Sequence, residues 1–330
     1  MRRAVALLTI AAVAVAAALA VTQRRARPAV RAEPTVLERF AAAETLGGVV
    51  GGFGSAWLVD SSRDRVVRID PRGPWATGTI PVRAPGWIPI ASGDGALWVV
   101  EASGSAAAKD TVAGPLLRVD PRSDRVTARI PLRTPAGSAF EAWAVLAGHG
   151  VVWVGGPDGL LRVDPRTNRV TAEISTAAGG YETAGFGLGG GHLWVALSDG
   201  RLLRFDARTG AAGAAFRSPV LGDVLTVGGR LVVVGAHEVV RLDPRSGRVV
   251  WRTDLGTVYA ATAAGGRVWL SASSAPAARA EGDRLIGLDA RTGRVAANVG
   301  AGEFGIGGLA AVGRRLWMAT AGGRVVVVQP

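Results

Sequence analysis

A short turn sequence recurs along the chain and constrains its fold more than any other feature. Its clearest form is Asp-Pro-Arg-Thr-Asn-Arg-Val at 164–170. Related copies open at Asp120, Asp243 and Asp289, and weaker copies open at Asp70 and Asp206. A repeat spaced by roughly forty residues is typical of solenoids and propellers, because each copy is one small unit that stacks on its neighbours. The repeat therefore predicts a scaffold, and it specifies no reaction.

An apolar run, usually containing Trp, precedes each turn. These runs lie at 56–59, 97–100, 152–154, 193–196, 231–234, 268–270 and 316–319. In each unit a second run ends at the Asp, a third follows the turn, and a fourth leads into the next unit. Short apolar runs rich in β-branched residues and split by Gly and Pro indicate strands. Seven units of four antiparallel strands predict an all-β fold, a seven-bladed β-propeller.

The repeated turn has the chemistry of a hairpin between the third and fourth strands. Asp at the first corner bonds the backbone two residues on, and Pro at the next position presets φ near −65°. Asn168, Asp124, Gly210, Gly247 and Gly293 then follow in their respective copies. Gly, Asn and Asp are the residues that tolerate a positive φ, so each copy is predicted to be a turn.

The two ends of the chain predict how the ring closes. The last unit supplies runs at 309–312, 316–319 and 324–328 and stops at Pro330 without a fourth strand. The segment Thr35–Phe40 resembles the fourth-strand runs and has no partners of its own. We therefore expect an N-terminal strand, at about residues 35–40, to complete the last blade. Closure of this kind removes the sheet edges that invite aggregation.

The N-terminus indicates export. Arg2 and Arg3 precede an uncharged apolar run at 4–21, and Arg24 and Arg25 follow it. A basic start before an Ala-rich apolar run is typical of an export signal, but this run is also near the length of a membrane span. Residues 1–21 are thus a signal peptide or a signal anchor, 22–34 a linker, and 35–330 the propeller domain. Either alternative predicts an exported protein, secreted or anchored to the outer side of the cytoplasmic membrane.

Composition argues against several kinds of chemistry. The chain has no Cys, which excludes a disulfide framework and a thiolate metal site. Its three His residues, His149, His192 and His237, fall on two different predicted faces and show no metal-ligand spacing. The glycine-rich stretch 185–191 does not open a helix, so it lacks the context of a phosphate-binding loop. We predict no metal and no cofactor, and no catalytic residues stand out.

Strand alternation divides the predicted propeller into two faces. The turn face carries the turns between third and fourth strands and those between first and second strands. The loop face carries the crossovers between blades and the loops between second and third strands. Arginines of the repeated turn should form a basic ring on the turn face: Arg72, Arg122, Arg125, Arg166, Arg169, Arg208, Arg245, Arg248, Arg291 and Arg294. This ring either faces an anionic membrane surface or is solvated beside the turn Asp residues. The sequence does not favour nucleic acid as a partner, because basic and aromatic residues do not interleave.

The loop face carries the candidate binding residues. Several crossovers pair an aromatic residue with an acid where they enter an innermost strand, and innermost strands surround the central channel. The predicted ligand-binding residues are Trp87, Glu141, Trp143, Tyr181, Glu182, Tyr259, Glu303 and Phe304. Aromatic walls with a few carboxylates are typical of a binding pocket. The alternative is that the aromatic residues fill gaps between blades and the acids are solvated.

The repeats resemble those of the YVTN family and of PQQ-like β-propellers. The resemblance rests on Trp-Val followed by Val-Asp-Pro-Arg-Thr-Asn-Arg-Val, and on Arg241–Trp251, which is similar to a tryptophan-docking repeat. It covers roughly residues 35–330. More distantly, the array resembles virginiamycin B lyase, an enzyme of seven blades that uses His, Glu and Mg²⁺, but the Pro-His-Gly crossovers of that enzyme are missing here.

Two functions remain open from the sequence. The favoured one is an extracytoplasmic binding or scaffolding protein, a monomer that engages a protein, peptide or glycan through the loop face. The alternative is an enzyme of lyase or lactonase type with a site at the channel mouth. An enzyme should lose turnover when Glu141, Glu182 or Glu303 is replaced, whereas a binding protein should show no turnover.

Overall fold

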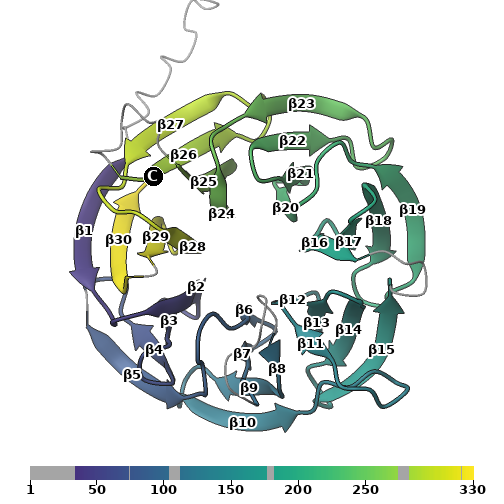
Figure 1. The fold of residues 1–330 in the computed structure, drawn as a ribbon, viewed down its shortest axis with the longest axis horizontal. Helices are drawn as coiled ribbons and strands as arrows, with labels where there is room; N and C mark the ends of the chain where they lie inside the picture. Colours follow the sequence, from purple (N-terminus) through teal and green to yellow (C-terminus); the bar gives the residue numbers. More distant parts are fainter. Residues whose placement is uncertain (1–33, 74, 104–111, 177–181, 274–281, 321) are drawn as a thin grey trace, which may run out of the picture. The chain divides into compact units, whose positions relative to one another are not determined.

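The computed structural model describes residues 34–73, 75–103, 112–176, 182–273, 282–320 and 322–330. Within these residues, seven four-stranded antiparallel sheets surround a central axis (Figure 1). The predicted all-β, seven-bladed propeller is therefore confirmed. The predicted signal segment and most of the linker lie outside the described residues, as does Tyr181.

Each blade places its first strand innermost and its fourth strand outermost. Blade 1 has β2 (Leu46–Gly52), β3 (Ser55–Asp60), β4 (Arg65–Ile69) and β5 (Ala76–Pro81); blade 2 has β6 (Ile90–Gly93), β7 (Ala96–Val100), β9 (Leu116–Asp120) and β10 (Arg125–Ile130). Blade 3 has β12 (Ala144–Gly148), β13 (Val151–Gly156), β14 (Gly159–Asp164) and β15 (Arg169–Ser175); blade 4 has β16 (Thr183–Gly189), β17 (His192–Leu197), β18 (Arg201–Asp206) and β19 (Ala212–Arg217).

Blades 5 to 7 follow the same order. Blade 5 has β20 (Asp223–Val227), β21 (Arg230–Val234), β22 (Glu238–Leu242) and β23 (Val249–Asp254); blade 6 has β24 (Val258–Ala264), β25 (Arg267–Ala272), β26 (Arg284–Asp289) and β27 (Val295–Gly300). Blade 7 has β28 (Ile306–Val312), β29 (Arg315–Thr320), β30 (Arg324–Gln329) and β1 (Thr35–Ala41). A further two-stranded sheet joins β8 (Val112–Ala113) to β11 (Glu141–Ala142); the sequence had indicated only loop and crossover there.

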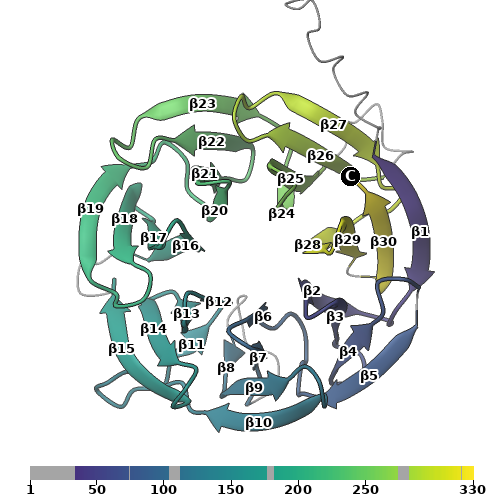
Figure 2. The ribbon, with the colours of Figure 1, turned by 180° about the vertical axis from the view of Figure 1, so that it is seen from behind.

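Blade 7 combines the two ends of the propeller, as predicted. β1 runs antiparallel to β30, from Thr35 beside Gln329 to Ala41 beside Arg324 (Figure 2). A second contact supports this pairing, because the Arg39 guanidinium donates to the Ala301 carbonyl of blade 6 at 3.1 and 3.2 Å. The open edge that β30 would otherwise present is therefore covered.

The core lies between the sheets and is built mainly from the second and third strands. Trp57, Trp98, Trp153, Trp269 and Trp317 are at most 1 % exposed, and every residue of β3, β7 and β13 is buried. The outermost strands instead alternate between exposed and half-buried side chains, as in β1 and β19. This pattern fits sheets that pack face to face around a ring with one edge toward solvent.

Small residues let the innermost strands approach each other closely around the axis. A β-carbon at Gly51 would collide with the Ala311 carbonyl of blade 7, and one at Gly187 would collide with the Val224 carbonyl of blade 5. Neighbouring innermost strands therefore meet backbone to backbone, a contact that only glycine permits.

The repeated turn has the predicted geometry. The Oδ1 atom of Asp120 accepts from the N–H of Arg122 at 3.0 Å, and Asp164 accepts in the same way from Arg166 at 2.7 Å. Four residues after each Asp, φ is positive, at 55° for both Asp124 and Asn168. Gly210, Gly247 and Gly293 take the same place with φ between 70° and 75°.

Each of the six repeated turns receives an arginine from the preceding blade, and we name this contact the blade latch. The latch arginines are Arg68, Arg118, Arg162, Arg204, Arg241 and Arg315. Each guanidinium donates to a backbone carbonyl of the next turn, at distances from 2.6 Å for Arg315 to 3.4 Å for Arg204. The latch is thus a hydrogen bond that ties one blade to the next.

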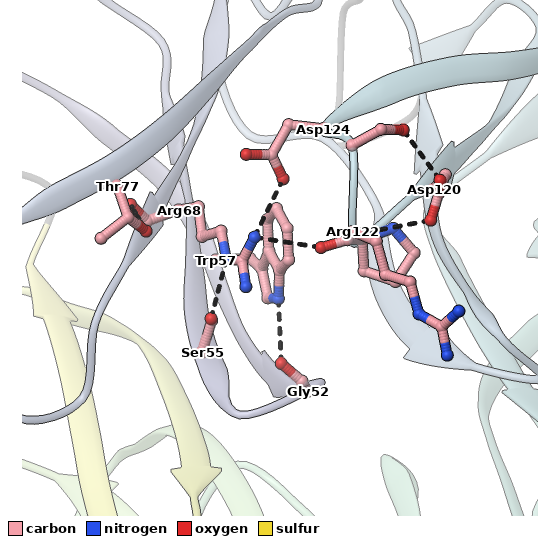
Figure 3. Close-up of polar contacts among 10 residues, drawn as sticks. Gly52, Ser55, Trp57, Arg68, Thr77, Asp120, Arg122 and Asp124 are labelled. Carbon is pink, nitrogen blue, oxygen red and sulfur yellow. Dashed lines mark hydrogen bonds and ion pairs between the residues drawn. The ribbon is translucent and has the colours of Figure 1, made fainter.

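In blades 1, 2 and 4 the latch arginine also lies on the buried tryptophan of its own blade. The Arg68 guanidinium lies 5.3 Å from the Trp57 ring centre, donates to the Pro121 carbonyl at 3.1 Å, and lies 3.5 Å from Asp124 (Figure 3). Arg118 repeats this arrangement over Trp98 at 5.7 Å, with the Pro165 carbonyl at 2.8 Å and the Asn168 side-chain oxygen at 3.2 Å. One side chain therefore combines a cation–π contact with a hydrogen bond between blades.

We predict that Arg118→Met lowers the free energy of unfolding by about 1–3 kcal/mol, because the Pro165 carbonyl and the Asn168 oxygen lose their charged donor. Methionine keeps much of the apolar packing against Trp98, so the change removes the hydrogen bonds together with the cation–π contact. Urea unfolding followed by tryptophan fluorescence measures the effect. The matched control is Arg122→Met, an exposed arginine of the same blade, which should shift stability by less than about 0.5 kcal/mol. Equal effects of the two changes would contradict the latch.

Candidate functional site

The ten arginines predicted to form a ring are all exposed, and the turns that carry them lie at one face of the propeller. Each turn also holds an aspartate whose pKa is lowered: Asp70, Asp120, Asp164, Asp206, Asp243 and Asp289. At Asp70 the cause is the hydrogen bond from the Arg72 side chain and then that from its N–H, which bring the pKa to about 2. At Asp164 the N–H of Arg166 is the main cause. The turn face thus pairs exposed cations with ionised aspartates.

Crevices on the turn face are lined by latch residues. One of about 240 Å³ lies between blades 4 and 5 and is bounded by His192, Trp194, Arg204 and Arg245, among others. The His192 and Trp194 rings meet edge to face at 5.9 Å, and Arg204 lies 5.9 Å from the Trp194 ring. A similar crevice in blade 1 is lined by Arg68 and Asp70. These spaces belong to the junctions between blades.

The loop face carries a different set of side chains around the channel. Trp87, Tyr259 and Phe304, all predicted binding residues, are 46 %, 47 % and 60 % exposed. Each lies where the chain enters an innermost strand, in blades 2, 6 and 7. Leu221 holds the corresponding place in blade 5 and is 46 % exposed. Sequence reasoning missed Leu221 because it looked for aromatic residues there.

Trp143 and Glu303 contact neighbouring parts of the scaffold. Trp143 is half-buried and packs edge to face on Phe186 of blade 4, with 5.4 Å between ring centres. The Glu303 carboxylate forms an ion pair of 2.6 Å with Arg324 on β30, and its carbonyl accepts from the N–H of Asp283. Both side chains therefore make structural contacts, Trp143 with blade 4 and Glu303 with blade 7.

Glu141 and Glu182 are exposed near the loop face. Glu141 lies on β11, where it pairs with Ala113 of β8. The backbone N–H of Glu182 donates to the Ser198 hydroxyl at 3.2 Å. Among the described members of the predicted set, Trp87, Tyr259 and Phe304 are the exposed aromatic residues.

Asp223 is the acidic residue at the mouth that the sequence reasoning missed. It opens β20, and among the seven innermost strands as the structure describes them it is the one charged residue. Together with Tyr259, Ala184, Ala236 and Ala260 it lines a recess of about 180 Å³. The sequence signal was available, since Leu221-Gly222-Asp223 leads into an otherwise apolar strand.

The surrounding protein raises the pKa of the Asp223 carboxyl, because the crowded mouth solvates its charged form less well than water does. Solvent still reaches the side chain, which is exposed along the channel. The described residues offer it neither a hydrogen bond nor an ion pair. They also contain no group of three or more His, Asp or Glu side chains close enough to hold a metal ion. No helix among them is long and apolar enough to cross a membrane.

Comparison with known proteins agrees with the resemblance of the repeats to PQQ-like propellers. Residues 198–330 match a family model described as outer membrane protein assembly factor BamB, of the PQQ type. No curated protein matches the chain in sequence. The family match and the propeller fold together support the PQQ-like propeller family that the sequence repeats predict.

Three solved structures illustrate the likeness of fold. BamB from Moraxella catarrhalis is 14 % identical, with a TM-score of 0.57 over 91 % of this chain and 98 % of that one. The β-propeller domain of Cps50 (Swd1) from Myceliophteria thermophila is also 14 % identical, with a TM-score of 0.68 over 90 % and 99 %. A chain of the Mitotic Checkpoint Complex is 12 % identical, with a TM-score of 0.68 over 89 % and 94 %. At such identities the comparison establishes the fold alone.

We predict that acid weakens the fold through the turn aspartates. Their folded-state pKa values lie below the ordinary value near 4, so ionised carboxylates stabilise the folded state, and protonation removes that contribution. The free energy of unfolding should therefore be constant above about pH 5 and fall from about pH 4 to about pH 2. Urea unfolding at a series of pH values measures this dependence.

The double change Asp164→Asn and Asp243→Asn should reduce that acid dependence in part, because two of the six turn aspartates keep an oxygen that accepts the turn N–H but lose their charge. Asp158→Asn serves as the control, since Asp158 lies outside the repeated turns. An acid dependence that the double variant leaves unchanged would show that the turn carboxylates are not its source.

Proposed function

On the premise that the chain is a PQQ-like β-propeller, we propose that it is an extracytoplasmic scaffold that binds a protein or peptide partner through its loop face. The observation that carries the proposal is the apolar rim, defined as Trp87, Leu221, Tyr259 and Phe304. These four exposed side chains lie at the entry to innermost strands in four blades. Exposed apolar groups gathered at one opening are typical of interaction sites.

The position of the first strand supports the assignment of partner binding to the loop face. β1 begins at Thr35, which pairs with Gln329 at the end of β30, so β1 starts at the turn face. The basic start and apolar run at 2–21 favour export. If that segment is held in a membrane, its attachment point leaves the loop face free for a partner.

The enzyme alternative has less support in the described residues. Of its three predicted acids, Glu303 is paired with Arg324, and Glu141 and Glu182 enter the loop face from different crossovers. The comparison with propellers of known structure speaks only to the fold. Binding is the function for which the exposed apolar rim provides a direct physical reason.

We predict that a photo-reactive phenylalanine analogue placed at Tyr259 or Phe304 captures a discrete protein in cells of the source organism. The apolar rim brings the partner within reach of these positions, whereas Trp75, which is 67 % exposed on the turn face, serves as the matched aromatic control. Denaturing gel electrophoresis and mass spectrometry identify the adduct. The same adduct should disappear when Leu221 and Trp87 are both changed to Ser.

The outcomes of this cross-linking separate the alternatives. Capture from Trp75 alone would overturn the loop-face assignment. A sugar-bearing adduct without protein would point to a glycan partner. Persistence of the protein adduct after the change of Leu221 and Trp87 would show that the rim does not hold it.

We also propose that the exposed turn-face arginines contact an anionic membrane surface, where each charge near the lipid contributes about 1 kcal/mol. The chain shortened to residues 33–330 should then float with vesicles that contain phosphatidylserine, and high salt should release it. Neutral phosphatidylcholine vesicles provide the control. Arg166→Gln, Arg169→Gln and Arg208→Gln together should weaken flotation. Absence of salt-sensitive binding to anionic vesicles would refute this contact.

A further inference from the structure

We propose that the recess at the loop-face mouth is a subsite for a cationic side chain, an arginine or lysine of an extended peptide segment, with Asp223 as its counter-ion. This inference rests on the proposed binding function and specifies the chemistry of the partner. It identifies where on the loop face the partner is anchored and which of its residues enters the protein.

The recess has a size and lining that suit one long side chain. Its volume of about 180 Å³ is several times the roughly 30 Å³ share of a water molecule. Its walls come from the first strands of blades 4, 5 and 6, from Gly222 before β20, and from Val234, Gly235 and Ala236 at the end of β21 and after it. Most of its lining residues are Gly, Ala and Val. Such walls accommodate the aliphatic stem of an arginine or lysine, which packs readily on apolar surface.

Charge selects the kind of ligand. Four other acids of the loop face form ion pairs: Glu101 with Arg129, Asp199 with Arg201, Glu238 with Arg252 and Glu303 with Arg324. Asp223 has no such partner among the described residues, although it is the one charged group of the described innermost strands. The Asp223 side chain is exposed and lines the recess, so a cation that enters the recess can pair with its carboxylate.

The neighbourhood of Asp223 favours an organic cation. The described residues around it include no second carboxylate or imidazole in the recess, and a single carboxylate is a poor site for a metal ion. Tyr259 instead adds an exposed aromatic ring, which attracts guanidinium and ammonium groups. Leu221, two residues before Asp223, extends the apolar surface toward residues that flank the cation in a peptide.

The test uses the full chain and two small probes of matched shape. N-acetyl-arginine amide carries the guanidinium charge, and N-acetyl-citrulline amide replaces it with a neutral urea. Alanine-methyl NMR spectra report binding locally, because Ala184, Ala236, Ala260 and Ala261 line the recess. We expect the arginine probe to shift these four methyl signals and the citrulline probe to leave them in place. Added salt should weaken the shifts, because it screens the attraction.

Asp223→Asn should raise the Kd of the arginine probe by about tenfold or more, since a hydrogen bond to a charged group contributes about 1.5–3 kcal/mol. Asp158→Asn, a loop-face change away from the recess, should leave the Kd unchanged. Equal binding of the two probes, or undiminished binding to the Asp223→Asn variant, would overturn the subsite. Shifts confined to methyl groups outside the recess would overturn it as well.

The outcomes of this experiment can refute the cation subsite without refuting the proposed scaffold function, and the reverse also holds. A protein adduct at Tyr259 together with no response to the arginine probe would retain the scaffold and eliminate the cation subsite. A tenfold loss on Asp223→Asn without any protein adduct would retain a cation site and eliminate the protein partner. The Asp223→Asn change can also be made in the cross-linking experiment, where it connects the cation subsite with the protein partner. Loss of the Tyr259 adduct is expected only when the captured partner inserts a cation.

Discussion

The arginine latch between neighbouring blades is the contact on which the ring depends. Each latch guanidinium approaches a turn whose aspartate already holds the backbone amides, which leaves the turn carbonyls free to accept. In blades 1, 2 and 4 the same guanidinium lies on the buried tryptophan of its own blade. A blade therefore completes its tryptophan packing in the same contact that fixes its neighbour, and repetition of this junction sets the geometry of the circle.

The junction between blades 6 and 7 is held by a different contact, because the repeat lacks a latch arginine there. The third strand of blade 6 has Gly287 at the latch position, and a β-carbon there would collide with the Trp269 ring. The next blade also has no repeated turn, because its outer strand is β1 from the other end of the chain. The Arg39 guanidinium on β1 instead reaches back to the Ala301 carbonyl of blade 6. The closing junction thus keeps the same pairing of guanidinium with carbonyl, but its direction is reversed.

The sequence predicted the turns and strands, which depend on local repeated patterns. It did not predict the roles of crossover residues, which depend on their distance from the propeller axis. Turn residues such as Asn168, and the strand that begins at Thr35, are visible because backbone conformation and strand patterning are local properties. The role of a crossover residue depends on its distance from the axis and on the blade beside it. Trp143 and Glu303 shared the pattern of Tyr259, yet they pack against Phe186 and Arg324. Asp223 went unnoticed because one acid in an apolar strand forms no motif.

The two faces of the propeller have different roles, because their side chains make different contacts. On the turn face, the aspartates hold the backbone amides of the turns and the latch arginines hold the turn carbonyls, so changes there affect the scaffold first. On the loop face, some crossover side chains such as Trp143 and Glu303 contact neighbouring blades, whereas Trp87, Leu221, Tyr259 and Phe304 are exposed. An exposed apolar rim is unfavourable for an isolated fold, and the solvent-exposed carboxylate of Asp223 beside it has no described partner. Both features lie where the contacts that hold the blades together do not need them, and this is the physical reason to place recognition there.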